Sequence, residues 1–220
     1  MQPPRDPSNV THVLVAAFPA RLAGAVQSVL AVMPDARLAP AESFEVVEVQ
    51  GETVAIPYRI YNEEPETGGS ERPLTETQQV ILHCLYSRHS DGRVRQRHLE
   101  KIMASSEPWV VPFVVQLAGE YVLEILDAIS LGVPGLAAPG SADRRLYGEF
   151  IERNPDFFAR TERRVVSYWS CYYRRKYEVF GTYPGSALME AFRAAASEHS
   201  GVQWPRHAPP PSATCSAGPP

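Results

Sequence analysis

The sequence predicts an α+β protein, in which a small N-terminal strand-helix-hairpin unit packs with a mainly helical body of about five helices. Two changes along the chain support this fold class. Apolar residues alternate in two short runs before residue 62, whereas after residue 73 they recur at helical spacing. Between these parts, the segment 63–73 is acidic, contains two prolines and a Gly-Gly pair, and has no apolar residue, which is typical of a linker.

The N-terminal unit, residues 10–62, begins with a β-branched apolar run at 10–17 that predicts a strand. A stripe of apolar residues over 20–33 then predicts a helix. The alternating runs 44–49 and 53–61 flank a turn that contains a glycine, so we expect them to pair as a β-hairpin.

The helical body contains the most informative segment of the chain. Residues 109–129 are almost wholly apolar, and a helix that is apolar nearly all round belongs in a protein core, so we expect one core helix here. Thr75 and Gln78 have the spacing of a capping box at the first helix of the body. Two copies of the tetrapeptide Pro-Gly-Ser-Ala predict helix N-caps at Ser141 and Ser186.

Both ends of the chain are rich in proline. We expect residues 1–9 to be a disordered lead-in and residues 202–220 to be a disordered tail, which leaves 74–201 for the helical body. The 220 residues are 44% hydrophobic and 10% aromatic, a composition that allows one sizeable core and excludes wholesale disorder. The formal net charge of −4 indicates no particular class of partner.

The expected location is the cytoplasm. The first residues lack the basic and then apolar layout of a secretory signal. The cysteines Cys84, Cys171 and Cys215 lie far apart and form no C-x-x-C pair, as expected of free thiols in a reducing compartment. Acidic residues within 109–129 argue against a membrane span.

Four polar side chains interrupt the apolar segment at spacings that place them on one face of a helix: Gln116, Glu120, Glu124 and Asp127. The three carboxylates are suited to binding a divalent cation or to acid–base chemistry. We favour a structural role, at a solvated helix edge or paired with arginine, because burying three unpaired carboxylates would be prohibitive. One alternative function is therefore a small enzyme that uses Glu120 and Glu124 with a nearby histidine, His83 or His98.

Metal-ligand residue types crowd one expected helical hairpin, at His83, Cys84, His89 and His98. Their spacing matches no zinc pattern, and the adjacent His83 and Cys84 point to different helix faces. The sequence also contains no nucleophile elbow, no phosphate-binding glycine loop and no H-E-x-x-H. We therefore expect no metal, no cofactor and no catalytic residues.

A second alternative function is nucleic-acid binding through two basic patches. These patches are Arg93, Arg95 and Arg97 in one, and Arg174, Arg175 and Lys176 in the other. Residues 74–103 have the sequence pattern of a helix-turn-helix module, with two expected helices joined by a short turn. However, the helix expected next is apolar and belongs in a core. Nucleic acid is therefore not the partner that we expect.

The densest aromatic and basic cluster lies between residues 163 and 177. Val165, Trp169 and Tyr172 fall on an apolar stripe, which predicts the core-facing side of a helix. On the flank of that stripe lie the residues of a candidate interface, Tyr173, Tyr177, Arg174, Arg175 and Lys176. Aromatic side chains beside arginine are the composition of an interface hot spot, so we predict that these residues bind a protein.

The sequence thus favours a non-enzymatic, cytoplasmic protein-interaction or regulatory factor. Its expected partner is a different protein or a second copy of the chain, with no membrane involved. The acidic face and the basic patches supply the two alternatives, a small enzyme and a nucleic-acid binder.

Overall fold

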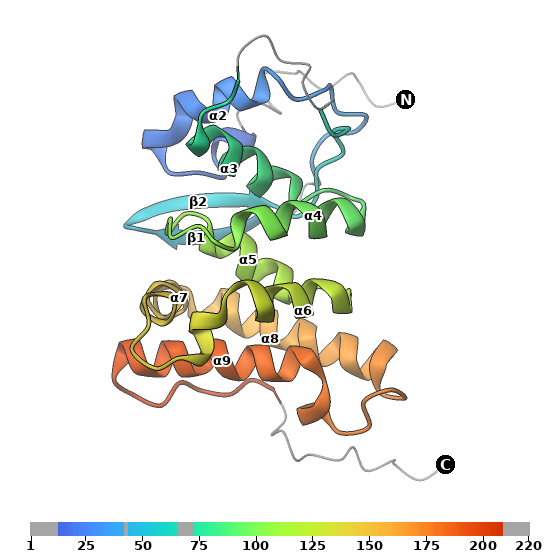
Figure 1. The fold of residues 1–220 in the computed structure, drawn as a ribbon, viewed down its shortest axis with the longest axis vertical. Helices are drawn as coiled ribbons and strands as arrows, with labels where there is room; N and C mark the ends of the chain where they lie inside the picture. Colours follow the sequence, from blue (N-terminus) through green and yellow to red (C-terminus); the bar gives the residue numbers. More distant parts are fainter. Residues whose placement is uncertain (1–12, 42–43, 66–72, 209–220) are drawn as a thin grey trace. The chain divides into compact units, whose positions relative to one another are not determined.

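The structure is a computed structural model that describes residues 13–41, 44–65 and 73–208 (Figure 1). Within these ranges it is mainly helical and holds one two-stranded antiparallel sheet, so the predicted α+β class is confirmed. The chain divides into two compact units, Met1–Phe113 and Val114–Pro220. The boundary lies inside helix α5 (Val111–Ala118), well beyond the segment 63–73 that we expected to be the linker.

Unit 1 contains the sheet and the first helices. Its elements are η1 (Ala20–Leu22), α2 (Ala23–Leu30), β1 (Phe44–Val49), β2 (Glu52–Pro57), α3 (Glu76–Tyr86) and α4 (Gly92–Ile102). Helix α3 packs against both α2 and α4. The capping box expected at α3 is present, because the Thr75 side chain accepts a hydrogen bond from the Gln78 backbone and the Gln78 side chain accepts one from Thr75.

The predicted hairpin forms with β1 and β2 in antiparallel register, Phe44 opposite Pro57 and Val49 opposite Glu52. The two turn residues, Gln50 and Gly51, have φ angles of 52° and 83°. Positive φ at both central residues is the geometry that matches the right-handed twist of the strands, and it explains the glycine.

The strand expected at 10–17 is not found in its described part, where residues 13–15 are helical. Leu14, Ala17 and Phe18 are buried, and these positions have the three- and four-residue spacing of a helical face. The helical spacing of these buried residues, and not the β propensity of the β-branched residues, therefore determines the local structure. The Ala16 carbonyl instead accepts a hydrogen bond of 2.8 Å from the backbone of Ala55 in β2.

The named elements of unit 2 in its described residues are all helices. Its elements after α5 are α6 (Leu123–Gly132), η2 (Pro134–Ala137), α7 (Ala142–Arg153), α8 (Pro155–Tyr168), the π-helix η3 (Trp169–Tyr173), η4 (Phe180–Thr182) and α9 (Pro184–Ser200). Helices α7 and α9 pack closely, because Gly148 lies directly against the backbone of Ala195. No helix in the described ranges has both the length and the apolar character needed to cross a membrane.

The single core helix expected at 109–129 is two helices, α5 and α6, separated by residues 119–122. Gly119 lies at this break, where an added Cβ would be 3.3 Å from the Thr161 side chain of α8. The chain therefore bends where it passes close to another helix. With this extra break, the described range 74–201 contains seven α-helices instead of about five.

The two Pro-Gly-Ser-Ala copies behave differently. Ser141 is the N-cap of α7, and its side chain accepts a hydrogen bond of 3.0 Å from the Arg144 backbone, as predicted. Ser186 is inside the first turn of α9, so its expected capping role is wrong. Pro184 occupies the first helical position there and starts the helix earlier.

Part of the expected C-terminal tail is fixed to unit 2. The Trp204 backbone donates a 2.9 Å hydrogen bond to Ser197 of α9, and the His207 backbone donates one of 3.1 Å to Glu162 of α8. Arg206 pairs with Glu190 of α9. The prediction of a disordered tail therefore fails for residues 202–208, while residues 209–220 and the expected lead-in 1–9 lie outside the described residues.

Candidate functional site

Three tyrosines of unit 2 form a cluster in which each ring contacts the other two. We call Tyr121, Tyr168 and Tyr172 the tyrosine face. The ring centroids are 5.8 Å apart for Tyr121 and Tyr168, and 6.2 Å apart for each of the two pairs that include Tyr172. Tyr172 is 69% exposed and Tyr121 is 48% exposed, so two large aromatic side chains contribute to the surface.

The π-helix η3 explains why Tyr172 is exposed. Val165 and Trp169 are buried, as the apolar stripe predicted, but Tyr172 is not part of that stripe. A π-helix has more residues per turn than an α-helix, so the side chains that follow its start are rotated away from α-helical positions. The expected core position of Tyr172 is therefore wrong. Trp169 secures the turn by donating a 2.7 Å hydrogen bond from its indole N–H to the Tyr177 carbonyl.

Tyr173 and Tyr177, the aromatic residues of the predicted interface, are half-buried against Tyr183. The ring centroids of Tyr173 and Tyr183 lie 5.5 Å apart in a stacked arrangement, and Tyr177 meets Tyr183 edge-on at the same distance. The Tyr173 hydroxyl also donates a hydrogen bond to the backbone carbonyl of Tyr121. These two residues thus support the tyrosine face from one side instead of forming its most exposed part.

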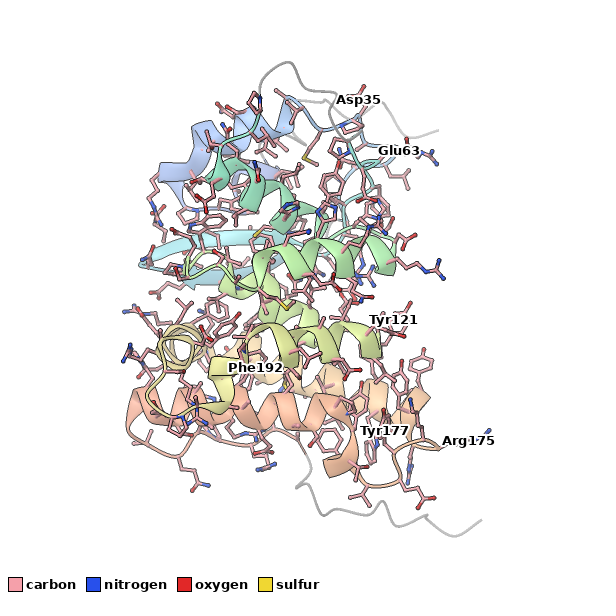
Figure 2. All side chains as sticks on the ribbon, in the orientation of Figure 1. Asp35, Glu63, Tyr121, Arg175, Tyr177 and Phe192 are labelled. Atoms are coloured by element: carbon pink, nitrogen blue, oxygen red, sulfur yellow. The ribbon has the colours of Figure 1, made fainter. Side chains whose placement is uncertain are left out.

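The basic residues of the predicted interface lie beside these rings. Figure 2 shows Tyr121, Tyr177 and Arg175 at the same end of unit 2, with the Arg175 side chain extending away from the ribbon. Arg175 and Lys176 are exposed, and the Lys176 ammonium nitrogen lies 5.3 Å from the centre of the Tyr177 ring. Cationic side chains therefore lie beside the aromatic rings at this end of unit 2.

The helix break separates the acidic residues that the sequence placed on one helical face. Gln116 and Glu120 are buried, and Glu120 makes polar interactions there. Glu124 and Asp127 are exposed on α6. Burial, together with the charge of Glu124, raises the pKa of the Tyr173 hydroxyl, which places Glu124 beside the aromatic cluster. The described side chains of His, Cys, Asp and Glu include no group of three arranged to hold a metal ion.

In unit 1, His83 and His98 form a hydrogen-bonded chain with Glu64. The Nδ1 atoms of the two rings are 2.9 Å apart, and His98 Nε2 lies 2.8 Å from a Glu64 carboxylate oxygen. Burial lowers the pKa of His83 to about 4, helped by the neighbouring His98 and the charge of Lys101. Burial also lowers the pKa of His98, although Glu64 opposes this shift.

Cys84 and His89, the other two residues of metal-ligand type in this part of the chain, have packing roles. Cys84 is buried, and burial raises the pKa of its thiol well above the ordinary value. The Tyr86 ring stacks on both His98 and His89, at centroid distances of 5.0 and 6.2 Å. The chain of His83, His98 and Glu64 thus ties α3 and α4 to the residues before position 66.

The first basic patch does not form one surface. Arg95 is buried, and its guanidinium donates 2.9 Å hydrogen bonds to the carbonyls of His89 and Ser90. Arg97 is exposed and pairs with Glu64. Arg93 remains exposed at the start of α4. Of these three arginines, one is therefore committed to the interior of unit 1.

Sequence reasoning found the neighbourhood of the tyrosine face but missed its principal members. Tyr121 lies 47 positions before Tyr168 in the chain and stands within an apolar run, where it indicated a core residue. A usable signal was Gly119, because glycine inside a helical pattern marks a close approach or a break. Comparison with protein-family models, with curated proteins and with solved structures found no match to this chain.

Proposed function

We propose that this protein is a non-enzymatic binding factor that recognises a protein partner through the tyrosine face. The observation that carries the proposal is the cluster of Tyr121, Tyr168 and Tyr172, in which the Tyr121 and Tyr172 side chains are exposed while all three rings contact one another. Large exposed aromatic side chains gathered at one place are favoured at recognition sites, because their burial by a partner is strongly favourable.

The surface is also preorganised. Each ring of the tyrosine face is held by the other two, and the hydrogen bond from Tyr173 fixes the backbone of Tyr121. Binding would therefore order few side chains, which lowers its entropic cost. Tyrosine and arginine are the residue types most enriched among interface hot spots, and Arg175 supplies the second type.

The charged residues beside the rings restrict the kind of partner. Arg175 and Lys176 are exposed near Tyr177, whereas Glu124 is exposed near Tyr173, so a partner with acidic residues opposite the first two and a basic residue opposite Glu124 would match the surface. The partner is a different protein or a second copy of the chain. The proposal includes the cytoplasmic location expected from the sequence, where the thiols Cys84 and Cys171, both free in the structure, would stay reduced.

The test compares three tagged forms of the full chain in quantitative affinity capture from nuclease-treated host lysate. These forms are the wild type, Tyr121→Ala with Tyr172→Ala, and Leu131→Ala as a matched control that is also highly exposed in unit 2. We expect at least one protein to be captured equally by the wild type and the control. The double variant should capture about tenfold less of it, the loss expected for hot-spot residues.

Equal capture by all three forms would show that the tyrosine face does not bind that protein. Capture that is seen only in a parallel lysate without nuclease, and that purified RNA restores through the same tyrosines, would favour the nucleic-acid alternative. Circular dichroism of the three purified forms controls for loss of fold.

A further inference from the structure

The hydrogen-bonded chain of Glu64, His98 and His83 in unit 1 has no part in the proposed function. A Glu64 carboxylate oxygen lies 2.8 Å from His98 Nε2, and His98 Nδ1 lies 2.9 Å from His83 Nδ1. Lys101 follows His98 by three residues on α4, so both lie on one side of that helix. The charge of Lys101 acts on His83, which places this ammonium group near the last ring of the chain.

The order of the three groups determines which nitrogen carries each proton. Burial raises the pKa of Glu64, but the hydrogen bond with His98 and the charge of Arg97 prevail and lower it, so the carboxylate is ionised and only accepts. His98 Nε2 therefore donates to Glu64. Burial lowers the pKa of His98, so this ring is neutral and its Nδ1 holds a lone pair. His83 Nδ1 must then donate to His98, which leaves the lone pair of His83 on Nε2.

The Nε2 atom of His83 is open to reaction. His83 is half-buried, and its Nε2 makes no hydrogen bond to any residue in the described ranges. The buried polar atoms without a partner in those ranges do not include this nitrogen, so it is not enclosed. Burial, together with His98 and Lys101, lowers the pKa of His83 to about 4, which keeps the nitrogen unprotonated at neutral pH. An accessible, unprotonated imidazole nitrogen is a nucleophile.

We propose that His83 Nε2 is a phosphoryl-acceptor site for small anionic phosphoryl donors, with His98 as the proton acceptor and Glu64 as the group that orients His98. The Nε2 lone pair forms a bond to phosphorus, and the bond from phosphorus to the leaving group breaks with its electron pair on that group. The Nδ1 proton of His83 moves to His98 Nδ1, and Glu64 stabilises the resulting imidazolium. Lys101 favours an anionic donor, because lysine ammonium groups bind phosphate.

Phosphoramidate, a small donor whose leaving group is ammonia, tests the proposal on the purified full chain. An unstructured peptide with one histidine is added to the same tube as a reference. Tandem mass spectrometry measures initial labelling rates, and phosphorus NMR distinguishes the two isomers of phosphohistidine. We expect His83 to be labelled at Nε2. The ratio of its rate to that of the peptide should rise about fourfold from about pH 8 to about pH 6, because only the peptide, with a pKa of about 6.5, becomes protonated.

Two variants distinguish the proton relay from simple exposure of His83. Glu64→Gln removes the negative charge that stabilises the His98 imidazolium, so labelling of His83 should slow by about tenfold or more. This variant also loses the ion pair between Arg97 and Glu64. Arg97→Gln loses the same ion pair but keeps the contact of Glu64 with His98, so its rate should stay within about twofold of the wild type. Circular dichroism of both variants controls for loss of fold.

Labelling of His83 at Nδ1 would overturn the proposal, because it would show the opposite order of protons. A rate ratio that stays constant between the two pH values would also overturn it, as would equal slowing in the two variants. The isomer and the ratio are measured on the wild type, so they decide the proposal even if Glu64→Gln does not fold. None of these measurements involves the tyrosine face, so their outcome is separate from that of partner capture.

Discussion

The hydroxyl group of Tyr173 donates a hydrogen bond to the backbone carbonyl of Tyr121, 52 residues earlier in the chain. One partner lies at the end of the π-helix η3, and the other lies in the break between α5 and α6. This hydrogen bond therefore connects the two places where the chain departs from regular α-helix, the π-helix η3 and the break between α5 and α6. Together they bring Tyr121 to Tyr168 and Tyr172, so the tyrosine face depends on both.

Replacing Tyr173 with phenylalanine removes this hydrogen bond and keeps the ring. We expect Tyr173→Phe to lower the free energy of unfolding by about 1 kcal/mol, the typical net contribution of one hydrogen bond. Tyr172→Phe is the matched control, and it should change stability by no more than about 0.5 kcal/mol because its ring is exposed. Urea unfolding of the three proteins measures the difference, and equal stability of both variants would show that the bond contributes nothing.

Gly148 of α7 has no room for a side chain, because an added Cβ would collide with the backbone carbonyl of Ala195 in α9. Gly148→Ala should therefore destabilise the protein by about 1 to 3 kcal/mol through overpacking, despite the better helix propensity of alanine. Gly24 of α2 is the matched control, since nothing lies within 4 Å of its added Cβ. Gly24→Ala should be neutral or stabilising by up to about 1 kcal/mol in the same thermal or urea unfolding measurement. A stabilised Gly148→Ala protein would mean that α7 and α9 do not approach this closely.

Gln116 of α5 is buried, and neither polar atom of its side chain has a hydrogen-bond partner among the described residues. Gln116→Met keeps the length of the side chain and removes both polar groups. We expect it to raise the free energy of unfolding by about 1 to 2 kcal/mol, since burying an unsatisfied amide is unfavourable. A loss of stability in urea unfolding would instead indicate that Gln116 is hydrogen-bonded in solution, for example to a buried water.

The pair His83 and His98 makes stability depend on pH. The pKa of His83 is about 4 in the folded protein, against about 6.5 for histidine in an unfolded chain. Between these pH values the unfolded chain binds more protons than the folded protein does. The contribution of neutral His83 to the free energy of unfolding is therefore fully present above about pH 6.5 and is lost as the pH falls towards about 4. With allowance for the partial exposure of His83, we expect a loss of about 1 to 2 kcal/mol in urea unfolding over this range.

His83→Gln should reduce this dependence on pH, because it removes one of the two imidazoles. His207→Gln is the control, because His207 is an exposed histidine of unit 2 and its replacement leaves the hydrogen bond between His83 and His98 intact. An unchanged slope in His83→Gln would contradict the assignment of the effect to this pair.

Local signals in the sequence predicted local structure well. The hairpin around Gly51 forms with the expected pairing, and the capping box at Thr75 is present, because both depend on contacts within a few residues. The apolar character of 109–129 also correctly indicated a core, since residues 109–120 are all buried. These features follow from periodicity and capping alone.

The features that the sequence did not predict depend on contacts between residues far apart in the chain or on irregular helix geometry. Gly119 breaks the apolar segment where it meets Thr161 of α8, and no local pattern contains that contact. Tyr172 leaves the apolar stripe because the helix becomes a π-helix, which periodicity at 3.6 residues per turn cannot represent. The predicted interface at Tyr173 and Tyr177 therefore lay beside the most exposed aromatic residues instead of on them.

The most direct test of the tyrosine face is a photo-crosslinking amino acid placed at position 172 of the full chain in its host cells. The same amino acid at position 131, which is also exposed in unit 2, is the control. We expect light-dependent crosslinks from position 172 to a protein partner, well above those from position 131. Crosslinks from position 172 that are no stronger than those from position 131, or that join the chain to RNA, would contradict a protein-binding role for this surface.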